Sequence, residues 1–160
     1  MTQELRVKLL MELVWWVLTA IVVYLVISPL KGVFIDIPFL SGNIIGIVAA
    51  ITYARHILFL KHSLIARALW FKVVLVFVSI PMVFWLVSQI NSMQIKMDED
   101  GLFWFETFIR RDITAEQRIN LFEYFKHEYI FFCTSAVMGA VIFPFRLIVS
   151  IWRQYNVGTV

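Results

Sequence analysis

Cysteine is nearly absent from this 160-residue chain, which holds only Cys133. One cysteine excludes an intramolecular disulfide and a thiolate metal cluster within one chain. Charged residues make up only 16% of the sequence, against about 25% in soluble domains. The sequence has no His-Glu-x-x-His, Gly-x-Ser-x-Gly or glycine-rich phosphate loop. We therefore predict no catalytic residue, no cofactor and no metal ligand.

Apolar residues, in contrast, make up 61% of the chain, where soluble proteins have about 45–50%. A soluble domain of this size buries only about 68–70% of its surface, so these side chains exceed what one small core can hide. The net charge is +3, but the basic residues do not cluster in a way that is typical of nucleic-acid binding. The composition predicts an integral membrane protein in contact with the lipid bilayer.

Four apolar stretches approach the roughly 20 residues that cross the hydrocarbon core of a bilayer. They cover about 13–30, 38–58, 70–90 and 129–151. The predicted fold class is an all-α membrane protein with four transmembrane helices. The whole chain, 1–160, forms a single integral membrane domain, with one long outer loop over 91–128.

The distribution of lysine and arginine predicts the orientation. The N-terminal head, the connection between the second and third spans and the C-terminal end hold eight basic and two acidic residues, a net charge of +6. The opposite side holds six basic and nine acidic residues, a net charge of −3. Both termini are predicted to be cytoplasmic, and in a bacterium the protein would lie in the cytoplasmic (inner) membrane.

Small residues mark two helix faces for close packing, because close backbone approach supplies the van der Waals contact on which helix association in lipid depends. We predict that the second and fourth spans pack on each other, or that one of them packs on a second copy or a partner. The small residues of the second span recur at four-residue spacing, and those of the fourth span repeat the pattern: Gly42, Gly46, Ala50, Ala54, Ser135 and Gly139.

The outer loop offers two structures for residues 93–109. Apolar segments flank Asp98-Glu-Asp-Gly101, which favours a β-hairpin in a small extracytoplasmic cap; an interfacial helix is the alternative. Thr114 and Gln117 have the spacing of a capping box, so a helix is expected to begin near residue 115 and to run unbroken into the fourth span. Phe122, Phe125, Tyr129 and Phe132 would form a stripe on that helix, against which the segment packs.

Two groups of polar residues are candidate sites. Glu123 and His127 lie four residues apart on the predicted helix, as a pH-responsive pair or an ordinary solvated ion pair. Several basic or imidazole side chains near the end of the second span are candidate contacts for anionic lipid: Arg55, His56, Lys61, His62 and Arg67. With His56 and His62 at one side of the membrane and His127 at the other, no two histidines are expected to face each other across the bundle at a common depth, which disfavours bis-histidine haem ligation.

Three functions remain open at the level of sequence. The leading hypothesis is a non-enzymatic interaction, accessory or regulatory subunit of a membrane complex, as a homo-oligomer or bound to a partner membrane protein. The second is an oligomeric transporter or channel component, and the third is a membrane-embedded enzyme that acts on lipid. No intramembrane charge, which would mark a transport pathway, is evident from the sequence.

Overall fold

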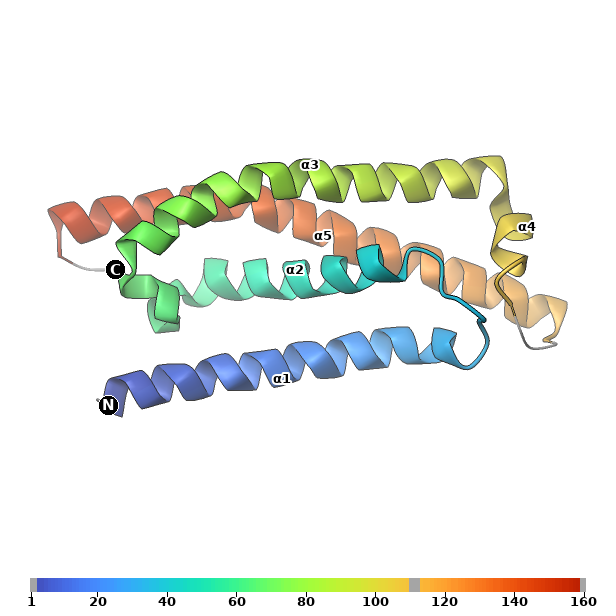
Figure 1. Ribbon diagram of the computed structural model, residues 1–160, viewed down its shortest axis with the longest axis horizontal. Coiled ribbons are helices and arrows are strands. Elements are labelled where there is room, and N and C mark those ends of the chain that lie inside the picture. The colour runs from blue at the N-terminus through green and yellow to red at the C-terminus, as the bar shows by residue number, and fades with distance from the viewer. Residues whose placement is uncertain (1–2, 110–112, 159–160) are drawn as a thin grey trace.

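The computed structural model describes residues 3–109 and 113–158, and among these it leaves the side chains of Glu4 and Arg67 undescribed. Four long helices lie side by side (Figure 1). They are α1 (Gln3–Lys31), α2 (Leu40–Phe59), α3 (Leu69–Glu99) and α5 (Ala115–Asn156). Each is long and apolar enough to cross a membrane, so the chain is a multi-pass, all-helical membrane protein, as the sequence predicts.

The connections between the long helices are short. Two 3₁₀ turns, η1 (Leu60–His62) and η2 (Leu64–Arg67), join α2 to α3, and the six-residue helix α4 (Gly101–Glu106) follows α3. The start of α1 and the end of α5 lie at one end of the bundle, which we call the terminal end; α4 lies at the opposite end, the loop end (Figure 1). Since α2 and α5 both run from the loop end to the terminal end, they are parallel neighbours.

The long helix α5 organises the packing. One series of its buried positions is spaced by four or three residues, the spacing that keeps one helix face against a partner in a coiled coil. They are Phe125, Tyr129, Cys133, Ala136, Ala140, Phe143, Leu147 and Ser150. On α3, buried residues recur every seven positions: Lys72, Ser79, Leu86 and Met93. Both α3 and α2 pack extensively on α5, whereas α1 lies mainly along α2.

Glycines bring α2 and α5 together. A Cβ atom built on Gly46 would lie 2.6 Å from Sγ of Cys133, and one built on Gly139 would lie 2.6 Å from Cβ of Tyr53. Of the other small residues in the predicted faces, Ala50 and Ser135 are half-buried and Ala54 is exposed. The small-residue faces therefore lie largely inside this chain, between α2 and α5.

The β-hairpin predicted over 93–109 is wrong. Residues up to Glu99 are the last turns of α3, and α4 begins at Gly101, whose φ of +54° separates the two helices. The described residues contain no strand, only an isolated bridge between Phe34 and Ile109. Helix continues here because Met93 and Met97, four residues apart, are both buried in the core that α5 shares; a two-stranded hairpin by itself is marginally stable.

The start of α5 agrees with the prediction. The Gln117 backbone N–H donates to Oγ1 of Thr114 (3.3 Å), and the Thr114 N–H donates to Oε1 of Gln117 (3.1 Å). These two bonds form the capping box. The helix then continues without a break to Asn156, a length of about 63 Å at 1.5 Å per residue. Because the hydrocarbon core is about 30 Å thick, α5 extends well beyond it.

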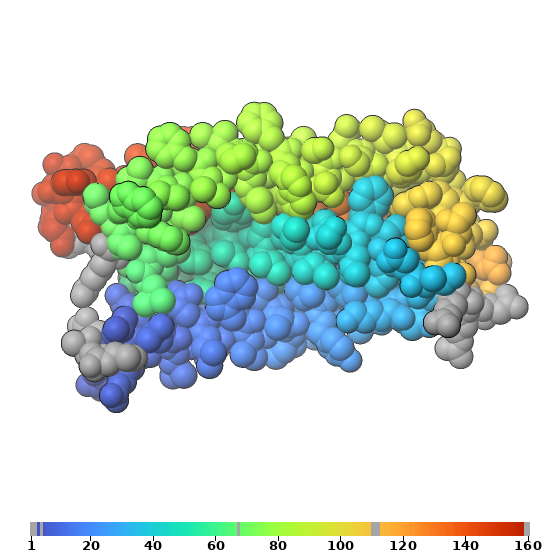
Figure 2. All heavy atoms as spheres, in the orientation of Figure 1, coloured from blue at the N-terminus to red at the C-terminus, as the bar shows by residue number. Residues whose placement is uncertain are grey.

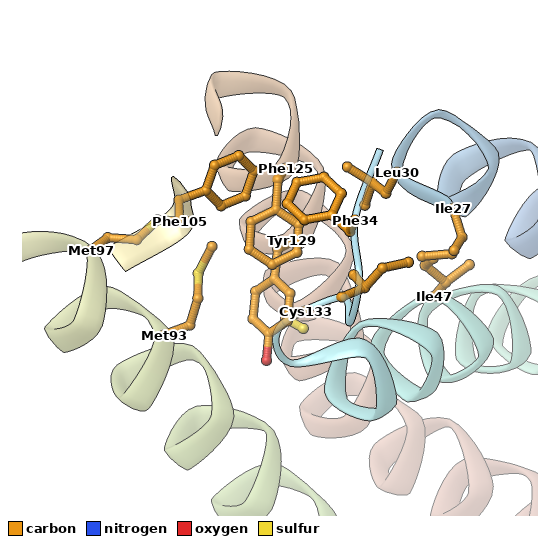
Figure 3. Close-up of a cluster of buried hydrophobic side chains, with 11 residues drawn as sticks. Ile27, Leu30, Phe34, Ile47, Met93, Met97, Phe105, Phe125, Tyr129 and Cys133 are labelled. Carbon is orange, nitrogen blue, oxygen red and sulfur yellow. The ribbon is translucent and has the colours of Figure 1, made fainter. Parts of the chain in front are cut away.

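Aromatic side chains close the loop end (Figure 3). The ring of Phe105, on α4, lies 4.9 Å from that of Phe34, 5.3 Å from that of Phe122 and 5.7 Å from that of Phe125, measured between ring centroids. Phe105 and Phe125 are fully buried. The segment after α3 therefore packs on the aromatic stripe of α5, but as a helix. We call Phe34, Phe105, Phe122 and Phe125 the loop-end cluster.

The Gly46→Ile substitution is expected to destabilise the protein by about 1–3 kcal/mol, because a side chain there must push Cys133 and α5 away. Thermal unfolding in detergent micelles measures the loss. Gly32→Ile is the matched control, since a Cβ atom at Gly32 meets no atom within 4 Å. In addition, Cys133→Ala should recover part of the stability lost in Gly46→Ala, because it removes the sulfur atom that the new Cβ atom would meet. Equal unfolding temperatures for the Gly46 and Gly32 variants would show that α2 and α5 do not approach this closely.

Candidate functional site

A buried polar pair links α2 to α5 one helical turn inside the loop end. Asn43 is fully buried in the first turn of α2, and Glu128 is 8% exposed on α5. The Asn43 side-chain amide donates a short hydrogen bond to Oε1 of Glu128. Their remaining oxygens, Oδ1 of Asn43 and Oε2 of Glu128, have no hydrogen-bond partner among the described residues. Among the described residues, Glu128 is the acidic side chain that is buried.

The surroundings of Glu128 offer partial rather than full charge compensation. A buried carboxylate is costly unless it is paired, and the amide of Asn43 is a neutral partner. The N-terminus of α2 carries a partial positive charge that favours a nearby anion. Tyr124, Tyr129 and Cys133, all within five residues of Glu128 on α5, carry no positive charge that could pair with it. The pair is thus well suited to fix how α2 sits on α5.

Gly42 leaves room for two polar groups, one from α3 and one from α5, beside α2. A Cβ atom built on Gly42 would lie 2.7 Å from Oη of Tyr129 and 2.8 Å from Oε1 of Gln89. Only a glycine leaves space for these two groups. The ring of Tyr129 is fully buried below the loop-end cluster, and its hydroxyl has no partner among the described residues. Figure 3 shows the hydroxyl pointing past Cys133, away from Phe125.

The terminal end contains a buried cation. Nζ of Lys72, in the first turn of α3, donates to Oγ of Ser150 (3.0 Å) and to Oε1 of Gln154 (2.9 Å), both on α5. Lys72 is fully buried. Both ends of the helix bundle therefore hold a buried charged side chain that bonds to a neighbouring helix, Glu128 at the loop end and Lys72 at the terminal end.

The predicted anionic-lipid contacts separate into two groups. Arg55 is buried and forms an ion pair with Glu12 of α1, with its guanidinium 5.8 Å from the Trp15 ring centroid. His56 is buried too, and its Nδ1 lies 2.7 Å from the backbone oxygen of Thr52. Arg55 thus links α2 to α1, and the His56 ring contacts Phe143 of α5, with 5.9 Å between the ring centroids.

The other three candidates lie in the connection between α2 and α3. Lys61 and His62 are exposed at the terminal end, where a headgroup could reach them. The side chain of Arg67 lies outside the described part of the chain.

Glu123 and His127 lie on the outer face of α5. Nδ1 of His127 lies 2.7 Å from the backbone oxygen of Glu123 and 3.6 Å from its Oε2. Both side chains are exposed, 76% for His127 and 48% for Glu123. An exposed i, i+4 pair of this kind contributes little to stability, and the structure brings no third ionisable group to it among the contacts it describes.

A lateral groove of about 360 Å³ opens between α1, α2 and α3. Figure 2 shows the surface of α2 uncovered between the α1 and α3 surfaces. Its lining is apolar except for Thr52, Tyr53 and His56, which lie toward the terminal end. Representative lining residues are Trp16 of α1, Val48 of α2, Ile65 of η2, Met82 of α3 and Phe143 of α5.

Known proteins add no assignment. The chain matches no protein-family model, no curated protein and no solved structure. Within the described residues, no three His, Cys, Asp or Glu side chains are grouped so that they could hold a metal ion. The chemistry of the site must therefore be argued from the polar pair, the buried lysine and the groove.

Sequence reasoning placed the charged residues at span ends but missed that some of them turn inward, among them Lys72 and Glu128. Lys72 lies in the first turn of α3, and Glu128 lies on α5 beside Asn43 in the first turn of α2. For Lys72 the signal was periodicity, because it shares a seven-residue spacing with Ser79, Leu86 and Met93. For Glu128 the local pattern was not decisive, because it lies between the exposed His127 and the buried Tyr129.

The Asn43→Ala substitution is expected to destabilise the protein by about 1.5–3 kcal/mol, because it removes a hydrogen bond to a buried charged group. Unfolding in detergent micelles measures the effect. Asn91→Ala, at an exposed position of α3, should change stability by less than about 0.5 kcal/mol. Adding Glu128→Leu to Asn43→Ala should recover part of the loss. A loss for Asn91→Ala equal to that for Asn43→Ala would argue against the pair.

Proposed function

We propose that this four-span membrane protein is a non-enzymatic accessory or regulatory subunit, and that it contacts its partner through the loop end. The observation that carries the proposal is the exposure of α4: Phe103 is 78% exposed, while its neighbour Phe105 is fully buried in the loop-end cluster. Ile35 and Ile119, at the same end, are 69% and 51% exposed. We call Ile35, Phe103 and Ile119 the loop-end surface.

The lengths of the helices argue that this surface lies outside the hydrocarbon core. The 20 residues of α2 span about 30 Å, which equals the thickness of the core. The last turns of α3 and the first turns of α5 extend beyond the start of α2, and α4 joins them there. An exposed apolar patch in water or at the headgroups marks an interaction site, and we propose that the loop-end surface is such a patch. The small-residue faces, by contrast, are used within the chain.

The partner of the loop-end surface is a membrane protein or a second copy of this chain. A transporter component is the second candidate, and the buried Glu128 favours it, since intramembrane carboxylates serve ion and proton pathways. However, Asn43 donates to one oxygen of Glu128, and Asn43 lies in the first turn of α2. The pair therefore lies near one edge of the span and not at its middle. Of the residues that line the lateral groove, none is a carboxylate, which favours lipid binding over hydrolysis.

A photo-crosslinking residue at position 103 is expected to capture the partner, because Phe103 stands at the centre of the proposed contact. Tyr155, 72% exposed at the terminal end, is the matched control position. Mass spectrometry of the products from native membranes identifies what is attached. Phe103→Asp should then abolish co-purification, whereas Tyr155→Asp should not. Equal protein crosslinking from both positions would refute a partner at the loop end. Crosslinks from position 103 to lipid only would refute it as well.

We further propose that the terminal end faces the cytoplasm. Its support is the basic excess there, which includes Lys61, Arg146 and Arg153. In a bacterium the membrane would be the cytoplasmic (inner) membrane, and the loop end would form an extracytoplasmic cap.

Thiol labelling checks this orientation. In a Cys133→Ala background, Phe103→Cys should react with a membrane-impermeant maleimide added to intact cells. Tyr155→Cys should react only after the membrane is opened, because it would lie on the cytoplasmic side. The reverse pattern would invert the proposed topology.

A further inference from the structure

The lateral groove exists because α1 is attached to the bundle at its two ends. At the terminal end, Glu12 of α1 pairs with Arg55 and accepts a hydrogen bond from the Leu64 backbone N–H (3.3 Å). At the loop end, Oη of Tyr124 donates to the backbone oxygen of Val26 (2.9 Å). Between these anchors α1 packs thinly on α2 and does not close against α3. The space between α1 and α3 therefore opens sideways, into the lipid.

The dimensions of the groove select its occupant. Its α2 lining runs from Ile44 to His56, a distance of about 18 Å along the helix axis. That length is close to the depth of one leaflet, which is half of a hydrocarbon core about 30 Å thick. The groove is open along one side and its lining is mainly apolar, which suits a hydrocarbon chain of the surrounding lipid. One extended acyl chain fits, aligned with the helices as lipid chains are.

The charges at the terminal end select the headgroup. The polar lining residues, Thr52, Tyr53 and His56, lie at this end of the groove, and Ile65 of η2 borders it. Lys61 is exposed in the same connection. Arg146, whose Nε donates to the backbone oxygen of Ile57 (3.2 Å), adds a second cation nearby. Basic residues at the membrane surface attract anionic lipids, so a negatively charged headgroup is favoured over a zwitterionic one.

We propose that the lateral groove binds one acyl chain of an anionic phospholipid, whose headgroup lies beside Lys61 at the terminal end. The bound lipid fills the space that α1 leaves between itself and α3. This inference does not rest on the proposed partner at the loop end, because the groove and the loop-end surface share no residue.

Native mass spectrometry tests the proposal on the full chain, released from nanodiscs of mixed phosphatidylglycerol and phosphatidylcholine. The protein is expected to retain one phosphatidylglycerol in preference to phosphatidylcholine. Val48→Trp and, from the α3 side, Met82→Trp fill the groove and should abolish retention. Val141→Trp is the matched control, because it lines a different lateral groove of about 280 Å³ between α3 and α5.

Charge reversal tests the headgroup without altering the core. Lys61→Glu should lower the preference for phosphatidylglycerol about fivefold or more, given the interaction of one basic residue with an anionic membrane surface. Lys31→Glu, at an exposed position of the loop end, should leave the preference unchanged. Equal retention of both lipids, or retention unchanged in the two groove-filling variants, overturns the proposal. So does a preference for phosphatidylglycerol that survives Lys61→Glu unchanged.

Discussion

The close approach of α2 to α5 is the constraint on which the rest of this structure depends. Lipid provides no hydrophobic force between helices, so packing and hydrogen bonds must hold them. Gly46 and Gly139 supply the packing, at two points about two turns apart along one interface. The Asn43–Glu128 hydrogen bond and the contact of Arg146 with Ile57 add polar links near the two ends of α2. With α2 fixed, α3 and α1 take the faces that remain.

Polar groups in this bundle specify arrangement more than they add stability. A buried polar side chain in a helix interface costs desolvation, but it penalises every register in which its partner is displaced. Asn43 and Glu128 meet only if α2 and α5 are parallel and in this alignment. Lys72 does the same for α3, since Ser150 and Gln154 accept from it together. A pair of apolar faces would tolerate sliding by one turn.

The sequence predicted the parts of the fold that depend on composition and local pattern. The four membrane helices and the capping box at Thr114 are confirmed. The hairpin over 93–109 was wrong, because the acidic turn signal ends a helix at Glu99 instead of joining two strands. What local pattern could not supply is the direction of each side chain. Glu128 and His127 are adjacent in sequence, yet one is buried and the other 76% exposed; only the position of α2 decides between them.

The parallel pairing of α2 and α5 has a consequence for how the chain is made. The partners Asn43 and Glu128 are 85 residues apart, and α2 leaves the ribosome long before α5 exists. Throughout that interval the Asn43 amide and the glycines of α2 that will face α5 can be covered only by lipid or another protein. Since α2 and α3 both pack on α5, which follows them in the chain, the bundle cannot mature one helix at a time. Its assembly must wait for α5, and a chain shortened before α5 would leave the other helices without their main packing partner, exposed to cellular quality control.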